Sequence, residues 1–440
     1  MVARGDARSR ASAALRGFFR EATAIDRAAL TAGLPERDGD LARELVSGVL
    51  RNRVRLDYEL SHVSRFPLEK LAPGVREALE VALYPMRFLD RIPVRASVHE
   101  GVEEARRRGG EGASRLANAV LRRLARERVP LPAGDDAASL AALFSHPTFL
   151  VERWLARFGL ERTRSILAAD NERGALSLLF DARRTDASSL LRELAEEGVI
   201  AEPSPLSSCG LRVTSGHPLR TAAFRDGRLY VADIGSQILV KLLPAGGALL
   251  DLAAAPGGKS IAALFSGLFD RAFALDRSLS RMPALLQNRR RLRLAALAPA
   301  AADLRRLPIA LGSASRVLLD APCTGTGTLR KNPEIRYRLH PEAIAGLAAT
   351  QRELLAAASR VVAPGGFLLY STCSLEAEEN EGVVAAFLAD SADFAPAGID
   401  APPELRPFVD GHRFRIFPDH GSDGFTAHLL RRFDKARVGE

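Results

Sequence analysis

Cysteine is scarce in this chain of 440 residues, which has only Cys209, Cys323 and Cys373. Three cysteines cannot build a disulfide framework for a chain of this length, and they indicate a reducing compartment. No apolar run approaches the ~20 residues of a membrane-spanning helix. The first residues also lack the apolar segment of a secretory signal. The sequence therefore predicts a cytoplasmic protein that has no membrane partner.

Lysine is equally scarce, at five positions, although 62 basic residues exceed 53 acidic ones and give a formal net charge of +9. Most of the positive charge is therefore arginine, which a biased genome composition would also produce. An excess of basic over acidic residues nevertheless favours a polyanionic partner, and nucleic acid is the first candidate. The scarcity of lysine makes Lys259 informative, because it lies inside a glycine-rich motif.

Residues 1–128 are predicted to be helical, since their apolar residues recur at three- and four-residue spacing. The expected helices are Ala11–Glu21, Asp40–Arg53 with Asp40 as its N-cap, Pro73–Tyr84, Val94–Arg108 and Ser114–Arg126. Residues 129–145 contain prolines and adjacent aspartates, and they are expected to be a linker.

Residues 146–232 predict a small α+β subdomain, and residues 233–440 alternate strands with helices. The strands expected in the last region are Ala248–Leu252, Arg271–Leu275, Arg316–Leu319 and Phe367–Tyr370. The helices expected there are Lys259–Phe265, Ser280–Arg293, Pro341–Val362 and Ala377–Ala389. This alternation predicts a doubly wound, Rossmann-like α/β domain.

Two apolar strands of this last region are each followed by a thiol. Asp320 ends the first strand and Cys323 follows it, whereas Ser371-Thr372-Cys373 follows the second. In an open α/β sheet, ligands bind beyond the carboxyl ends of the strands. A single free cysteine is more often a small buried hydrophobe, but two at matching strand ends predict a pair of reactive thiols. Cys209 lies in a predicted loop and receives no role.

A glycine-rich turn follows the first strand, and its candidate ligand-binding residues are Ala253, Ala254, Ala255, Pro256, Gly257, Gly258 and Lys259. The dinucleotide fingerprint G-x-G-x-x-G is absent. A phosphate loop would match Gly258-Lys259-Ser260, but Ala253 stands where its first glycine should be. A P-loop-like NTPase therefore stays open as an alternative.

Acidic residues at later strand ends favour another ligand. Asp276 closes the second strand, where a carboxylate can accept both ribose hydroxyls of an adenosine cofactor. Asp303 follows a third segment and could bond the adenine amino group. Each acid alone could be a helix N-cap, but the two in order predict a ribose-binding site without a pyrophosphate cradle. S-adenosylmethionine is the cofactor that this combination indicates.

The segments Asp251 to Lys259, Asp320 to Cys323 and Ser371 to Ser374 resemble the motifs of the Sun/RsmB-type RNA cytosine-5 methyltransferases. Asp90 to Pro93 and Asn118 to Arg123 are similar to the NusB-like domain of the bacterial ribosomal-RNA branch. This resemblance implies a NusB-like helical RNA-binding domain, a small RRM-like α+β middle subdomain and a Rossmann-like methyltransferase domain.

The resemblance also implies an activity, which is methyl transfer from S-adenosylmethionine to C5 of a cytosine in 16S ribosomal RNA. Cys373 would add to C6 of the base, and Cys323 would assist breakdown of the adduct. Asp320 would lie at the N3/N4 edge of the base, and Lys259 would help to keep Cys373 as a thiolate. The basic segment from Arg330 to Arg338 is expected to face RNA.

The expected partner is therefore small-subunit ribosomal RNA, without a metal, and the chain is expected to act as a monomer. A further alternative, besides the NTPase, is an RNA-binding assembly factor with an inactive methyltransferase domain. The intact pair of thiols and the intact acids argue against that reading.

Overall fold

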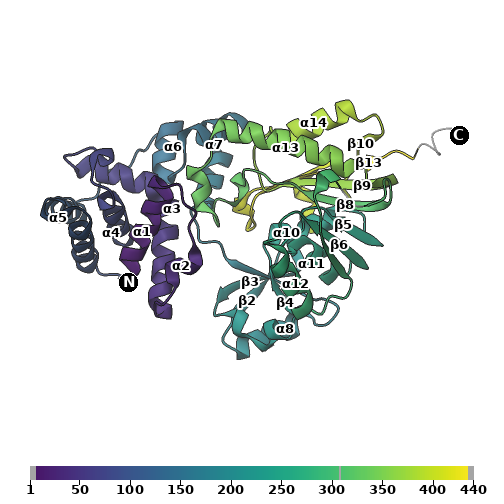
Figure 1. Ribbon diagram of the computed structural model, residues 1–440, viewed down its shortest axis with the longest axis horizontal. Helices are drawn as coiled ribbons and strands as arrows, with labels where there is room; N and C mark the ends of the chain where they lie inside the picture. Colours follow the sequence, from purple (N-terminus) through teal and green to yellow (C-terminus); the bar gives the residue numbers. More distant parts are fainter. Residues whose placement is uncertain (1–5, 307–308, 435–440) are drawn as a thin grey trace. The chain divides into compact units, whose positions relative to one another are not determined.

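The computed structural model describes residues 6–306 and 309–434 and divides the chain into two compact units (Figure 1). Unit 1 comprises Met1–Asn171, and unit 2 comprises Glu172–Glu440. Among the described residues, no helix combines the length and the apolar character needed to span a membrane.

Unit 1 is built from helices in its described part. They are α1 (Ala7–Arg20), α2 (Arg27–Thr31), α3 (Glu36–Val63), η1 (Leu68–Lys70), α4 (Val75–Phe88), α5 (Val94–Arg126), α6 (Ala137–Phe144) and α7 (Thr148–Ala169). Charged residues enter its core only with partners: buried Glu80 on α4 accepts hydrogen bonds from Arg53, 2.9 Å away, and Arg76, 3.0 Å away. Such pairing lowers the cost of burying a carboxyl group, although burial still raises the pKa of Glu80 to about 8.

Several details of unit 1 differ from the sequence prediction, among them α6, which lies within the expected linker of residues 129–145. Helix α3 begins at Glu36, so the prediction of Asp40 as an N-cap is wrong, and Gly39 lies inside the helix. Gly39 is buried because it packs against Thr31, where a Cβ atom on the glycine would lie 3.4 Å from the threonine Cβ. The predicted break between two later helices is a kink inside α5, at Gly110 with φ of 73°.

Unit 2 opens with a small antiparallel sheet of strand order β2-β3-β1-β4. Its elements are β1 (Leu176–Phe180), α8 (Ala187–Glu196), β2 (Ile200–Ser204), β3 (Ser207–Ser215), α9 (Ala222–Arg225) and β4 (Leu229–Val231). Strand β2 was not predicted. It contains Pro203 and lies at the edge of the sheet, which is where proline is tolerated in a strand.

The larger sheet of unit 2 has the order β11-β12-β13-β9-β8-β5-β6-β7, with β10 paired to β13. Its strands are β5 (Ala248–Asp251), β6 (Arg271–Asp276), β7 (Leu297–Ala301), β8 (Ala314–Asp320), β9 (Val362–Thr372), β10 (Phe394–Pro396), β11 (Val409–Asp410), β12 (Arg413–Ile416) and β13 (Phe425–Arg432). Strands β7, β6, β5, β8 and β9 are parallel neighbours in that order. Strands β10 to β13 make antiparallel pairs, and β13 joins them to β9. The predicted Rossmann-like domain is thus confirmed, with a mixed sheet.

Helices cover both faces of the larger sheet (Figure 1). Helices α10 (Ile234–Leu239), α11 (Gly258–Phe265) and α12 (Met282–Arg291) pack on one face, and α13 (Pro341–Ser359) and α14 (Glu381–Asp390) pack on the other. Along β8, Leu318 faces the first group, whereas Val317 and Leu319 face the second. Continuous apolar strands are expected where both faces of a sheet are buried.

The strand order reverses beside β5, because the chain continues to β6 and β7 and then returns to β8 on the other side of β5. Neighbouring connections leave a crevice at such a point, beyond the carboxyl ends of the strands. Asp320 of β8 lies opposite Ser371 of β9 in the register, so the two motifs that precede the cysteines end side by side.

Candidate active site

A cavity of about 560 Å³ lies at this crevice, beyond the ends of β5, β6, β7, β8 and β9. Its lining includes the sequence-predicted residues Ala253, Ala254, Ala255, Pro256, Gly258, Lys259, Asp276, Asp303, Asp320, Cys323 and Cys373. The one predicted residue that does not line it is Gly257. The structure therefore gathers residues from five separate strand ends around one space.

Gly257 acts through the backbone of the turn between β5 and α11. Its φ of 111° is a conformation that favours glycine, and a Cβ atom there would lie 2.6 Å from a methyl carbon of Leu285. The turn is held on its other side by the backbone N–H of Ala255, which donates to Oδ2 of Asp276 at 3.0 Å. These contacts fix the alanine-rich segment as one wall of the cavity.

Asp276 is almost fully buried at the end of β6. Its Oδ1 accepts the backbone N–H of Ser278 at 2.7 Å and a guanidinium N–H of Arg281 at 3.1 Å. Arg281 also donates to the carbonyl of Ala255 and lines the cavity, but no sequence motif singled it out. Its position depends on how α12 starts after the β6 turn, which no local motif encodes.

Asp303 lies beyond β7, and its Oδ1 accepts the backbone N–H of Arg305 at 3.0 Å. It therefore begins the short turn η4 (Leu304–Arg306) in the manner of a helix cap and lines the cavity as well. Its position is compatible with both roles that the sequence allowed, a helix N-cap and a ligand for the adenine amino group.

Asp251 ends β5 and is fully buried beneath the cavity. Ser260 donates its hydroxyl to Oδ2 at 2.6 Å, whereas Oδ1 has no hydrogen-bond partner among the described residues. Burial raises the pKa of this carboxyl to about 6. An unpartnered carboxylate oxygen at a cavity wall suits a ligand that brings a positive charge or an N–H group.

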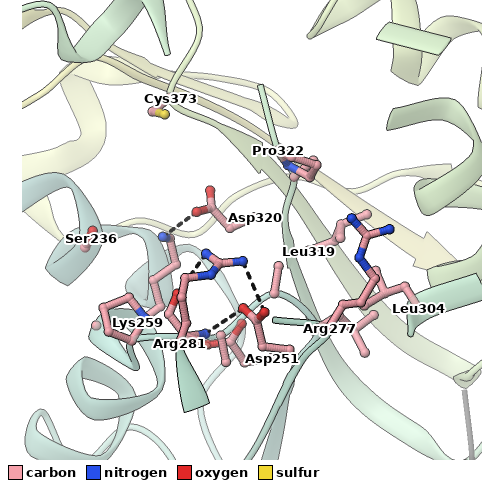
Figure 2. A pocket seen from close by; sticks show the side chains of 18 of the residues that line it. Ser236, Asp251, Lys259, Arg277, Arg281, Leu304, Leu319, Asp320, Pro322 and Cys373 are labelled. Atoms are coloured by element: carbon pink, nitrogen blue, oxygen red, sulfur yellow. Dashed lines mark hydrogen bonds and ion pairs between the residues drawn. The ribbon is translucent and has the colours of Figure 1, made fainter. Parts of the chain in front are cut away.

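Lys259 and Asp320 form an ion pair across the cavity, with 2.5 Å between Nζ and Oδ2 (Figure 2). Ser371 donates its hydroxyl to the second oxygen of Asp320 at 2.9 Å. Burial alone would lower the pKa of Lys259, but the negative charges of Asp320, Asp251 and Cys373 outweigh it and raise that pKa. Lys259 is therefore a fixed cation in the site.

The two sulfurs meet at one end of the cavity, 3.3 Å apart, and both cysteines are free thiols. A disulfide would need about 2.05 Å. The hydrogen bond to Cys373, followed by burial, raises the pKa of Cys323 well above its ordinary value. Cys323 therefore holds its proton, and its thiol can donate a hydrogen bond to the sulfur of Cys373.

A buried carboxylate behind the sulfurs holds both cysteine loops, and the sequence did not single it out. Oε1 of Glu379 accepts the backbone N–H of Thr324 at 2.8 Å and the side-chain N–H of Gln351 at 2.9 Å. Oε2 accepts the hydroxyls of Thr324 and Ser374, the residues directly after the two cysteines. One side chain thus ties together two loops that lie fifty residues apart in the chain.

The expectation that the basic segment after Cys323 faces RNA is wrong for its central residues. Arg330 and Arg336 are buried, with 7% and 1% of their surface exposed. Lys331 forms ion pairs with Asp233 and Asp423, the latter at 3.1 Å. Arg330 also lies 3.6 Å from Asp423, so these two cations are paired with carboxylates of unit 2.

Three protein-family models match the chain in sequence order. The NusB family matches residues 6–126, the ferredoxin-like domain of RsmF/B-like methyltransferases matches 146–220, and the 16S rRNA methyltransferase RsmB/F model matches 240–431. The predicted NusB-like, RRM-like and Rossmann-like folds are confirmed by these matches. The domain boundaries at residues 128, 145 and 232 stay a prediction.

Curated relatives span nearly the same length as this chain. A probable ribosomal RNA small subunit methyltransferase B of Bacillus subtilis is 33% identical and covers 91% of this chain and 92% of its own. The corresponding Thermus thermophilus methyltransferase is 35% identical, with 93% and 92% covered. The chain belongs to the RsmB/F family of ribosomal RNA methyltransferases.

A solved structure supports the fold of this family member. The crystal structure of PH0851 is similar with a TM-score of 0.77 and 26% identity, over 96% of this chain and 99% of that one. Methyltransferases of this family depend on S-adenosylmethionine, and the cavity fits that cofactor in three respects. It has the volume of a small-molecule site, its rim carries the carboxylates of Asp276 and Asp303, and its floor carries the unpartnered oxygen of Asp251.

Other site chemistries find less support in the family member. The lysine and serine of the P-loop-like segment are both engaged inside the protein, Lys259 by Asp320 and Ser260 by Asp251. A P-loop needs these two side chains for phosphate and magnesium. Within the described residues, no group of histidine, cysteine and acidic side chains could hold a metal ion.

Proposed function

We propose that this protein methylates C5 of a cytosine in 16S ribosomal RNA through a covalent adduct between Cys373 and C6 of the base. The observation that carries the proposal is the 3.3 Å approach of two free sulfurs at the end of the cofactor cavity. The names of the relatives support the small ribosomal subunit as the source of the substrate.

Carbon C5 of cytosine is a poor nucleophile, so the ring must be activated before it can accept a methyl group. Addition of the Cys373 thiolate to C6 moves electron density to C5 and turns the ring into an enamine. The ammonium of Lys259 contributes the positive surroundings that favour a thiolate. S-adenosylmethionine, when bound, supplies an electrophilic methyl group.

Asp320 and Lys259 are placed to handle the charge that develops on the ring. We assign Asp320 to the N3/N4 edge of the base, where protonation of N3 would stabilise the adduct. Its ion pair with Lys259 and its hydrogen bond from Ser371 fix the carboxylate beforehand, which lowers the reorganisation needed during reaction.

Release requires that the C6–S bond breaks after C5 has gained its methyl group. Loss of the C5 proton to a base restores the C5–C6 double bond, and Cys373 departs as a thiolate. Cys323 keeps its proton and lies 3.3 Å from the departing sulfur, so it can stabilise that thiolate by donating a hydrogen bond. This assigns different roles to two otherwise similar cysteines.

Product analysis tests the proposal. Unmodified 16S RNA transcript, or small subunits from a strain that lacks the enzyme, would be incubated with the protein and labelled S-adenosylmethionine, and the nucleosides would then be separated. The expected product is 5-methylcytidine from the wild type and none from Cys373→Ala. Label on another nucleoside would contradict the proposal, and no transfer to any RNA would favour an assembly factor without methyltransferase activity.

A further inference from the structure

Helix α5 of unit 1 forms a groove whose lining residues all belong to this helix. The helix kinks at Gly110, and residues before and after the kink line one depression of about 710 Å³. Five arginines line it: Arg95, Arg106, Arg115, Arg122 and Arg126. We call this depression the α5 groove.

Most of the groove arginines lack a partner within unit 1. Arg95, Arg115, Arg122 and Arg126 are exposed, and none of them forms an ion pair or a side-chain hydrogen bond with another described residue. The exception is Arg106, which pairs with Glu103 at 2.7 Å and with Glu111 at 2.9 Å.

Arginines of the same helix that point away from the groove are paired instead. Arg107 and Arg108 both donate to buried Glu104, each at 2.8 Å, and Arg123 donates to Glu127 at 3.0 Å. The difference between Arg122 and Arg123, adjacent in sequence, shows that the groove side of α5 is where positive charge is left uncompensated. Uncompensated arginines gathered in a concave site indicate an anionic ligand.

The remaining lining suits a polymer better than a single ion. Val98 and Val102 are only partly buried and give the groove an apolar strip between the arginines, and Asn118 adds an amide. A nucleic-acid strand offers phosphates to guanidinium groups and the less polar faces of its sugars and bases to such a strip.

We propose that the α5 groove binds the backbone of the RNA substrate, with Arg95, Arg115, Arg122 and Arg126 on successive phosphates. The identity of that RNA rests on the proposed function, whereas the groove itself does not depend on it. Contacts of this kind hold an RNA in place without reading its sequence. The groove therefore sets affinity and its salt dependence, and the chemistry stays in unit 2.

The test compares two double variants of the full-length protein. R122Q/R126Q removes two unpaired groove arginines, and R43Q/R123Q removes two exposed arginines that are paired with carboxylates outside the groove. Both lose the same charge. Binding of unmodified 16S RNA transcript would be measured by fluorescence anisotropy over a range of salt concentrations.

For R122Q/R126Q we expect about 10-fold to 30-fold weaker binding near physiological salt, and a salt slope reduced by about 1.4 to 1.8 for the two lost phosphate contacts. For R43Q/R123Q we expect less than about a twofold change in RNA affinity, because each of those arginines is already paired with a carboxylate. Equal losses in both variants, or unchanged affinity and slope in R122Q/R126Q, would overturn the proposal.

Transfer kinetics separate failure of this proposal from failure of the proposed function. With an active enzyme, R122Q/R126Q should raise KM for RNA while kcat at saturating RNA and the affinity for S-adenosylmethionine stay unchanged. If the wild type yields no 5-methylcytidine but RNA binding still depends on the groove arginines, the groove proposal stands and the proposed function falls. If 5-methylcytidine forms and R122Q/R126Q binds RNA like the wild type, the proposed function stands and the groove proposal falls.

Discussion

The α5 groove and the cofactor cavity are both lined by charged side chains, but they use them in opposite ways. In the cavity, Lys259 is paired with Asp320, and Arg281 is paired with Asp276. In the groove, four of the five arginines have no such partner among the described residues. The cavity pairs Lys259 and Arg281 with carboxylates, whereas the groove leaves most of its arginines open to solvent.

This difference matches what each kind of site has to do. A catalytic group must already be oriented when charge develops on the substrate, and internal pairing provides that orientation. A surface that binds a flexible polyanion gains most from cations that have no internal competitor, because each phosphate contact also releases counterions. Variants in the cavity should therefore change rates, and variants in the groove should change salt-dependent affinity.

The largest effect is expected from Lys259→Met. This change removes the cation between Asp320 and Cys373, so transfer at saturating RNA should fall at least about 100-fold, the range of a lost proton-handling group. RNA affinity and its salt slope should not change. The matched control is Lys241→Met, since Lys241 is also largely buried and paired, with Glu404 at 3.3 Å, but does not line the cavity. A salt-dependent loss of RNA affinity in Lys259→Met would contradict the claim that the cavity sets the rate and the groove sets RNA affinity.

A smaller effect on rate, together with a loss of stability, is expected from Glu379→Gln. The amide brings a donor toward groups that already donate, Thr324, Ser374 and Gln351, so the unfolding free energy should fall by about 2–3 kcal/mol. Transfer should fall about tenfold or more, because the cysteine loops lose their common support. Thermal unfolding would measure the stability and single-turnover transfer the rate. The control is Glu378→Gln, because Glu378 is exposed. Normal rates despite lowered stability would show that Glu379 has no positioning role.

The smallest effect concerns His428 on β13, a buried ring in unit 2 whose two nitrogens have no hydrogen-bond partner among the described residues. Burial lowers the pKa of His428 from 6.5 to about 3. Because the folded state resists protonation, stability is complete above pH 6.5 and is lost as the pH falls toward 3. At pH 5.5 the loss should be about 1.4 kcal/mol.

His428→Leu should remove this acid sensitivity. Denaturant unfolding at pH 7.5 and pH 5.5 would show a smaller difference for the variant than for the wild type. The control is His217→Gln, since His217 is exposed and makes no side-chain hydrogen bond as a helix cap, so that its replacement should leave the pH profile as it is. An identical profile for His428→Leu and the wild type would mean that another group is responsible.

Much of unit 2 could be predicted from the sequence, because its strands are apolar on both faces and end in recognisable motifs. Parallel strands bring their carboxyl ends to one edge, so residues chosen at five separate ends line the same cavity. Four strands were not predicted, namely β2, β7, β10 and β11. Strands β2 and β7 contain Pro203 and Pro299 and lie at sheet edges, where pairing overrides a poor intrinsic tendency to form strands.

The groups that could not be predicted act through distant contacts. Glu379 lies in an acidic stretch that resembles the start of a helix, and only the folded chain brings it behind the cysteine loops. Burial also decides the role of Arg330 and Arg336, which local charge assigns to the surface. The α5 groove likewise depends on which arginines find a glutamate one turn away and which do not.

The most direct measurement of the central claim is the trapping of RNA on the protein. Cys323→Ala and Cys373→Ala would each be incubated with S-adenosylmethionine and unmodified 16S RNA, denatured, and separated by electrophoresis. We predict that Cys323→Ala gives a protein–RNA adduct that survives denaturation and that Cys373→Ala gives none. An adduct on Cys373→Ala, or on neither variant while both still transfer methyl groups, would contradict the assignment of Cys373 as the nucleophile and Cys323 as the group that aids release.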